Sequence, residues 1–181
     1  KITNNHAGDS GGGMNIQGGY VEIINSTVAN NEAYGGGGIS MGFGNDAHVY
    51  IHESTIRNNH INAHGAGIEV NNGAITLLNS TVSGNTTQQY GGGIYVRNGI
   101  VVLTNSTIAF NQAISAIALG GGVYVHSSEG IVNVQNSIIA KNTAQVVGND
   151  FRGELFSQGH NIIGDDDRAT IRGITTGNQI N

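Results

Sequence analysis

The sequence contains no cysteine, no proline and no tryptophan, and only 10% of its residues are Asp, Glu, Lys or Arg. Without cysteine the chain can form neither a disulfide nor a thiolate metal site. The net charge of -5, with no cluster of Lys or Arg, argues against binding to nucleic acid or to an anionic membrane surface. No apolar run approaches the roughly 20 residues that a membrane-spanning helix needs, so we expect no membrane insertion.

Glycine is abundant instead, with 30 residues among 181. A glycine-rich chain with little charge is often disordered, but here 38% of the residues are hydrophobic and they are regularly spaced, which favours a folded structure. A chain of this length can bury one sizeable core. The first residues, KITNNHA, begin in the middle of the pattern described next, so we interpret the sequence as a fragment or mature piece of a longer protein.

A repeated unit organises the whole chain. Residues 25–39 read NSTVANNEAYGGGGI, and closely similar segments begin at residues 79 and 105. The asparagine that ends each Val/Ile-x-x-Asn group recurs at spacings of 26, 28, 26, 26 and 31 residues. Recurrence at a fixed period is the signature of a repeat architecture. The six positions are Asn5, Asn31, Asn59, Asn85, Asn111 and Asn142.

Each unit contains three short apolar segments separated by Asn-rich and Gly-rich turns. Apolar and polar residues alternate with a period of two, as in Val21 and Ile23 or Ile39 and Met41, which indicates strands. One unit alone has too few inward residues to form a core, whereas stacked units bury continuous rows. We therefore predict an all-β parallel β-helix of about six coils of roughly 26 residues, with three strands per coil. Residues 1–181 would form one domain, and residues 143–181 an atypical terminal coil or cap.

The recurring asparagines and glycines are best explained by this fold. An asparagine at the same place in every coil can form a ladder, in which each side-chain amide bonds to the next and satisfies buried backbone groups of the turn. Glycine is expected at the following corner, because the sharp turn calls for positive φ and a Cβ would collide with the neighbouring coil. These residues are predicted to be structural.

The repeat also resembles a known family. GGGI, paired with STVANN, STIRNN, STVSGN and STIAFN, is similar to the right-handed parallel β-helix repeats of bacterial surface proteins, among them the chlamydial polymorphic outer-membrane proteins. The segments SQGHNIIGDDD (157–167) and TTGNQI (175–180) resemble the end of the β-helix in the choice-of-anchor Q proteins. The resemblance implies a right-handed coil of the pectate-lyase-like superfamily in a secreted or cell-surface protein. That superfamily mixes lyases, hydrolases, adhesins and scaffolds, so it selects no activity.

One polar column is a candidate for chemistry. Stacked coils would place His6, Glu32 and His60, each of which follows a ladder asparagine, at steps of about 4.8 Å, with His64 four residues beyond His60. Imidazole and carboxylate groups so arranged could hold Zn²⁺ or a similar ion, or act as acid and base. The alternative is a solvent-facing polar row, which we favour. We accordingly predict no cofactor, with Ca²⁺ or Zn²⁺ relevant only if this column binds metal.

A second candidate is aromatic. The outward position of the third strand is occupied by Tyr95 and Tyr124 in successive coils, so we expect two exposed neighbouring tyrosines. Exposed flat rings suit sugars, since they offer apolar stacking and a hydroxyl group. The alternative is a tyrosine pair that only stabilises the face of the sheet.

These observations predict a secreted or cell-surface scaffold or adhesin, without enzymatic activity, that binds a polysaccharide or cell-surface glycan along one face. The alternative is a metal-dependent polysaccharide lyase, in which Glu32, His60 and His6 would carry the catalysis. A third reading is a filament, because the open ends of a β-helix carry unpaired strand edges that favour end-to-end self-association.

Overall fold

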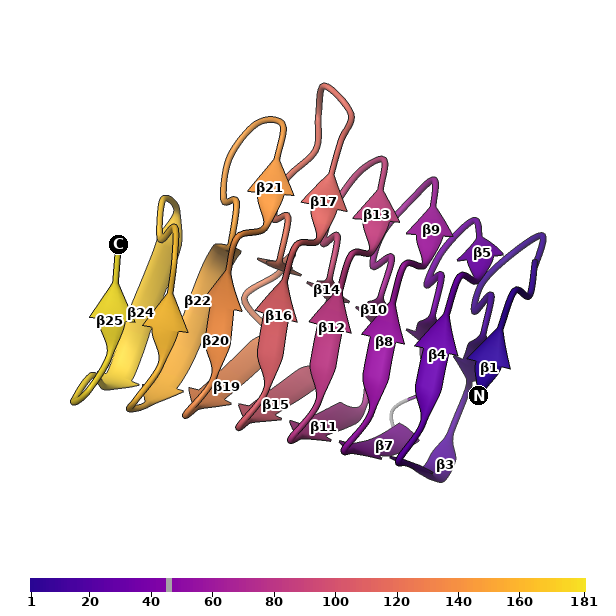
Figure 1. Cartoon of the computed structure of the whole chain (residues 1–181), viewed down its shortest axis with the longest axis horizontal. Helices are drawn as coiled ribbons and strands as arrows, with labels where there is room; N and C mark the ends of the chain where they lie inside the picture. The colour runs from indigo at the N-terminus through magenta and orange to yellow at the C-terminus, as the bar shows by residue number, and fades with distance from the viewer. Residues whose placement is uncertain (45–46) are drawn as a thin grey trace.

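In the computed structural model, which describes residues 1–44 and 47–181, the chain winds into a solenoid of stacked coils (Figure 1). Strands of successive coils pair in parallel, with a register that joins residues one repeat apart: Ile68 pairs with Ile94, and Ile94 with Val123. The described residues include no helix, so none of them forms a helical membrane span. The predicted all-β parallel β-helix of about six coils is confirmed.

The strands form three sheets that run along the solenoid axis. The first sheet contains the strands that follow the long strand of each coil. Its members, in order, are β1 (Ile2–Thr3), β4 (Thr27–Ala29), β8 (Thr55–Arg57), β12 (Thr81–Ser83), β16 (Thr107–Ala109), β20 (Ile138–Ala140), β23 (Ile162–Ile163) and β25 (Gln179–Ile180).

The second sheet consists of two stacks that one strand joins at the C-terminal end. The first stack is β2 (Met14–Ile16), β6 (Ile39–Met41), β10 (Ile68–Val70), β14 (Ile94–Val96) and β18 (Val123–Val125). The second is β3 (Gly19–Ile24), β7 (Ala47–His52), β11 (Ala74–Leu78), β15 (Ile100–Thr104) and β19 (Ile131–Gln135). β22 (Phe151–Gln158) pairs with both β18 and β19, and β24 (Ala169–Ile174) pairs with β22.

The third sheet is made of two-residue strands. All three predicted strands of a coil are present, and these additional strands lie between the second and the third. Two residues are too short to show a period, which is why the sequence pattern did not reveal them. They are β5 (Glu32–Ala33), β9 (His60–Ile61), β13 (Thr86–Thr87), β17 (Gln112–Ala113) and β21 (Thr143–Ala144).

The core consists of rows of aliphatic side chains that continue from coil to coil. One row runs through Val28, Ile56, Val82, Ile108 and Ile139, all of them buried. The rows of the other strands close the same interior, so each coil covers the apolar layer of the next.

Each regular coil turns at three places where the backbone is left-handed. Before and after each strand of the first sheet, the left-handed residue is most often asparagine, which tolerates this conformation better than most residues. Before each strand of the first stack of the second sheet, it is glycine. At Gly91, φ is +66° and an added Cβ would lie 2.6 Å from the carbonyl oxygen of Ile94. At Gly67 φ is not positive, but a Cβ would lie 2.5 Å from the carbonyl oxygen of Gly93 in the next coil. Glycine is therefore required at this corner for two reasons, the left-handed backbone at one position and the close approach of the next coil at another.

A ladder of asparagine side chains runs the length of the regular coils. The Nδ2 group of Asn85 donates to Oδ1 of Asn111 (2.9 Å) and to the carbonyl oxygen of Ile56 (3.2 Å). Its Oδ1 atom accepts from the backbone N–H and Nδ2 of Asn59, both at 2.9 Å. The same pattern links Asn5, Asn31, Asn59, Asn85, Asn111 and Asn142.

A second ladder is built from serine hydroxyls. Each of these serines comes directly before a strand of the first sheet. Its hydroxyl oxygen accepts a hydrogen bond from the backbone N–H of the equivalent serine in the preceding coil, as Ser106 does from Ser80 at 3.2 Å. The hydroxyl then donates to the carbonyl oxygen two residues upstream in its own coil, Thr104 in the case of Ser106. The two ladders satisfy the buried polar groups at two corners of every coil.

The C-terminal coils depart from the repeat. The asparagine ladder ends where Asn142 donates its backbone N–H and its Nδ2 to Oδ1 of Asp150, both at 2.8 Å. Asp150 is buried, and the strand that follows it, β22, passes from one stack to the other without the usual turn. Residues 143–181 thus include the one carboxylate that ends the ladder.

Candidate functional site

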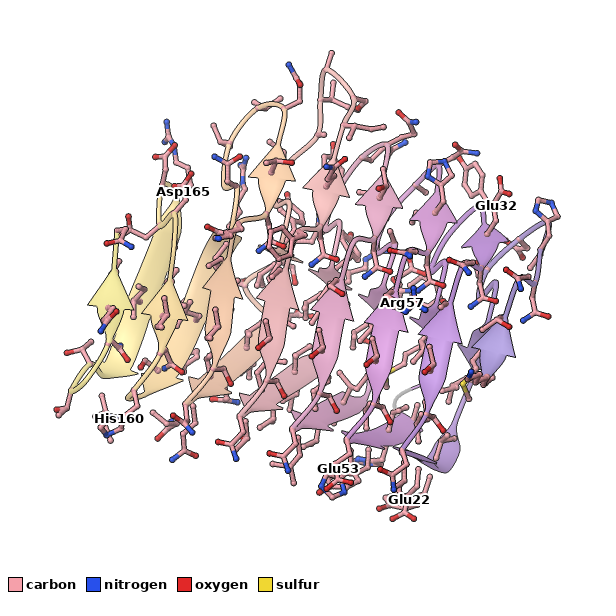
Figure 2. The ribbon with its side chains drawn as sticks, viewed as in Figure 1. Glu22, Glu32, Glu53, Arg57, His160 and Asp165 are labelled. Atoms are coloured by element: carbon pink, nitrogen blue, oxygen red, sulfur yellow. The ribbon has the colours of Figure 1, made fainter. Side chains whose placement is uncertain are left out.

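The predicted polar column is aligned but open to solvent. The backbone of His6 forms a parallel β-bridge with Glu32, and Glu32 pairs in register with His60. The Nδ1 atom of His6 lies 3.5 Å from Oε2 of Glu32, with side-chain exposures of 71% and 53%. Figure 2 shows Glu32 at the outer edge of the solenoid. This arrangement corresponds to the solvent-facing polar row.

His64, the fourth candidate for this column, does not join it. It forms a parallel β-bridge with Tyr90 of the next coil, and its imidazole stacks on the rings of both Tyr90 and Tyr95. The chain turns between His60 and His64, so four residues carry the side chain to another face. Within residues 1–44 and 47–181, no group of three or more His, Asp or Glu side chains could hold a metal ion.

Tyr95 and Tyr124 are neighbours, as predicted, with ring centroids 5.9 Å apart. The prediction that they are exposed was wrong, because only 4% of Tyr95 and 8% of Tyr124 are accessible. The corner that precedes each strand brings His64 and Tyr90 against the two tyrosines. We call His64, Tyr90, Tyr95, Tyr124 and His126 the aromatic cluster.

Within the aromatic cluster the ring faces cover one another. His64 stacks on Tyr90 at 4.9 Å with 10° between the planes and on Tyr95 at 4.8 Å with 17°. Tyr90 in turn stacks on Tyr124 at 5.1 Å. Stacked rings of this kind stabilise the fold. Their faces are taken up by one another, which leaves ring edges and hydroxyl groups for contacts with a ligand.

The cluster lies on one row of outward side chains. Strands β6, β10, β14, β18 and β22 pair in register at these positions. With about 4.8 Å between strands, the row extends for about 19 Å along the axis. Its members are Ser40, Glu69, Tyr95, Tyr124 and Arg152.

Several shifted pKa values occur together here. Burial raises the pKa of Glu69, although hydrogen bonds from Ser40 (2.9 Å to Oε2) and Asn71 act in the opposite direction. Burial lowers the pKa of His64, and it raises the pKa of Tyr95 to about 12. A concentration of perturbed groups is a feature of functional sites, although stacked structural clusters also produce it.

Two arginines border the cluster. The guanidinium of Arg152 lies 5.6 Å from the centre of the Tyr124 ring, and that of Arg97 lies 5.4 Å from the centre of the Phe43 ring. His126 completes this side, with its ring 6.1 Å from that of Tyr124. The cluster and its immediate neighbours therefore combine tyrosine hydroxyl groups, the buried carboxyl group of Glu69, two histidines and two arginines.

A hollow of about 380 Å³ lies next to the cluster rather than over it. It is formed where the longer segment 126–130 passes over β22. The carboxylate in its lining, Glu154, is bound by Nε of Arg172 at 2.7 Å. Its charged group is thus neutralised by an ion pair, and the cluster is the better candidate site. The hollow is lined by Val125, Ser127, Ser128, Gly130, Ile131, Gly153, Glu154 and Phe156.

Two other segments are longer than in the regular coil, residues 42–46 and 112–119. Residues 45 and 46 of the first lie outside the described residues. The second forms a loop after β17 that rises above the other coils (Figure 1). In this loop Ala118 is buried, but Ile114 and Ile117 face solvent.

Most of the aromatic cluster was missed by reasoning from the sequence. His64 and Tyr90 come directly before the left-handed glycines Gly65 and Gly91, a position that varies from coil to coil. Aligning this position with the outward position of the next strand would have brought His64, Glu69 and Tyr90 to the two tyrosines. The contribution of Arg152 could not be found this way, because β22 follows an irregular coil.

Comparison with known proteins agrees with the architecture. A family model described as the right handed beta helix region matches residues 1–175. No curated protein and no solved structure matches the chain. The parallel strands, the repeated coils and a match over nearly the full length agree, and the chain belongs to the right-handed β-helix family.

Proposed function

We propose that this chain is a stiff scaffold of a secreted or cell-surface bacterial protein and that it binds carbohydrate through the aromatic cluster. The observation that carries the proposal is the gathering of hydroxyl, basic and carboxyl groups on one row of an otherwise repetitive surface.

The scaffold part of the proposal rests on the ladders. Each regular coil is bonded to the next by backbone pairs, by an asparagine amide and by a serine hydroxyl. Bending the solenoid would require several of these bonds to lengthen together in a buried environment. Such an object holds its surface groups at fixed spacings.

The binding part rests on the ring edges. Sugars expose many hydroxyl groups, and fixed polar groups select among them by hydrogen bonding. The edges of Tyr90 and Tyr124, with His126, offer such groups at the border of the cluster. Recognition would proceed by hydrogen bonds rather than by the face stacking expected from the sequence.

The finer family assignment remains part of the proposal. The GGGI repeats and the segments SQGHNIIGDDD and TTGNQI support a relationship with the polymorphic outer-membrane and choice-of-anchor Q proteins. In the structure these two segments contain β23 and β25, which extend the first sheet past the regular coils. This relationship favours an extracellular location.

The ends of the solenoid favour one further proposal. β1 and β25 are the terminal strands of the first sheet and each has one unpaired edge. Unpaired edges can add strands from another copy. End-to-end self-association would appear as a rise in mass with concentration in light scattering, and a constant monomer mass would exclude it.

Binding can be tested with variants that remove hydroxyl groups and keep the rings. Tyr90→Phe combined with Tyr124→Phe preserves the stacking. We expect about a thirtyfold loss of affinity for any glycan that the protein retains, since two hydrogen bonds of about 1 kcal/mol each are removed. Tyr20→Phe is the control, because this exposed tyrosine bonds Glu22 away from the cluster.

The readout is retardation on gels that contain immobilised polysaccharides. Absence of retardation by every glycan, or equal affinities for the two variants, would overturn the proposed binding function. The same polymers can be followed for ultraviolet absorbance of unsaturated uronate products. A metal-dependent rise that Glu32→Gln abolishes would favour the lyase alternative.

A further inference from the structure

We infer that the aromatic cluster selects acidic glycans, in which a carboxylate or sulfate group of the sugar binds between Arg152 and His126, beside Tyr124. This inference rests on the proposed carbohydrate binding and adds the chemical class of the ligand. It is carried by the placement of the basic side chains and by what each of them contacts.

Two of the seven Lys and Arg residues of this acidic chain border the cluster. Both rest on aromatic rings, Arg152 on Tyr124 and Arg97 on Phe43. In the described part of the chain, the arginines that contact a carboxylate are Arg168 and Arg172, at the C-terminal end. The charges of Arg97 and Arg152 are therefore not neutralised by an ion pair among these residues.

The manner in which Arg152 lies on Tyr124 leaves it able to bind an anion. A guanidinium that stacks on a ring uses its face and keeps its N–H groups at the edge. These groups match the two oxygens of a carboxylate or two of those of a sulfate. His126 flanks the same Tyr124 ring and is exposed, so it can donate a further hydrogen bond.

Glu69, the carboxyl group on the same outward row, does not prevent an anionic sugar from binding beside Arg152. Glu69 is buried two coils from Tyr124, and Ser40 Oγ donates to its Oε2 atom. Burial raises the pKa of Glu69, and its Oε2 atom already accepts a hydrogen bond within the protein. The outward row therefore becomes more basic from Glu69 toward Arg152, and an anionic sugar is expected at the Arg152 end.

The experiment compares glycans that differ only in charge. The intact chain is titrated with pectate and with the same polymer after full methyl esterification, and with chondroitin sulfate and its desulfated form. We expect binding to at least one charged polymer and at least a tenfold weaker affinity for its uncharged or less charged counterpart. The affinity should fall as salt is added, since the contact is ionic.

Variants locate the contact. Arg152→Gln should weaken binding at low salt about tenfold or more and reduce the salt dependence, and Arg97→Gln should act in the same direction. Arg57→Gln is the matched control, because Arg57 is an exposed arginine that lies on β8 in the first sheet (Figure 2). Circular dichroism of each variant establishes that the coils remain folded.

The outcomes test the acidic-glycan inference and the proposed binding function separately. Equal binding of charged and neutral partners, or equal effects of Arg152→Gln and Arg57→Gln, overturns the acidic-glycan inference and leaves the proposed binding function standing. Binding to none of the glycans, charged or neutral, overturns the proposed function itself. A difference between the carboxylated and the sulfated polymers identifies which anionic group is bound.

Discussion

Removal of a single ladder amide from the middle of the solenoid should be far more harmful than removal of the first one. In Asn85→Ala, the buried backbone N–H and one Nδ2 hydrogen of Asn59 lose their acceptor. Leaving a buried donor unpaired costs about 1–3 kcal/mol, so the two together predict a loss of about 4 kcal/mol. That is a large share of the roughly 5–15 kcal/mol by which a domain is stable.

Asn5→Ala is the matched comparison. Asn5 is exposed at the first coil, where its side chain donates to Oδ1 of Asn31 at 2.9 Å. The backbone N–H of Asn5 still bonds that oxygen atom after the substitution. The expected loss is therefore about 1 kcal/mol or less.

Urea unfolding followed by circular dichroism and by tyrosine fluorescence measures both variants. The two signals should coincide, because solenoids can unfold in parts and a single free energy requires one transition. A similar loss for Asn85→Ala and Asn5→Ala, or a loss below about 1 kcal/mol for Asn85→Ala, would contradict the view that the ladder satisfies buried groups.

The other predictions concern the corner glycines and the aromatic cluster. Gly91→Ala should destabilise the protein by at least about 1–2 kcal/mol, because φ is positive and a Cβ would meet the next strand, whereas Gly8→Ala, with open space around it, should change stability by less than about 0.5 kcal/mol in the same urea assay. Glu69→Gln should stabilise the protein at pH 7: the folded-state pKa is raised, so the wild-type chain loses stability as pH rises from the unfolded pKa through the folded one, and the difference should vanish in acid. In an alkaline titration at 295 nm, Tyr95→Phe should remove the tyrosine that ionises last, at a pKa of about 12, and stability should fall with rising pH above 10 less steeply in this variant.

Most of the fold could be predicted because each coil repeats the same physical solution. The asparagines recur at one place in the unit, and only stacking explains why an amide should stand there six times. The serine ladder was not predicted, because its positions do not stand out in the sequence. Ser54 and Ser80 stand beside threonines in what looks like an ordinary turn, and hydroxyl bonds to the backbone leave little trace in a sequence.

The candidate site was harder to predict because period-two alternation reports only which side of a strand a residue takes. It places Tyr95 and Tyr124 outside the core, but it does not say what else covers that side. The covering residues, His64 and Tyr90, come from the preceding corner, where the coils differ. Burial on the outer surface of a solenoid is therefore set by its least regular segments.

The asparagine ladder has a direction, which follows from the bonds described above. From amide to amide, each side chain donates one N–H toward the C-terminal end and accepts at its oxygen from the preceding coil. The amide carbonyl groups therefore point the same way, and the last amide donates to the carboxylate of Asp150. An internal coil that gives and receives the same bonds can be duplicated or deleted as a unit without changing its neighbours. The length of such a protein can therefore change through gene duplication among the regular coils, while the coil that contains Asp150 marks one end of the region in which new copies can be inserted.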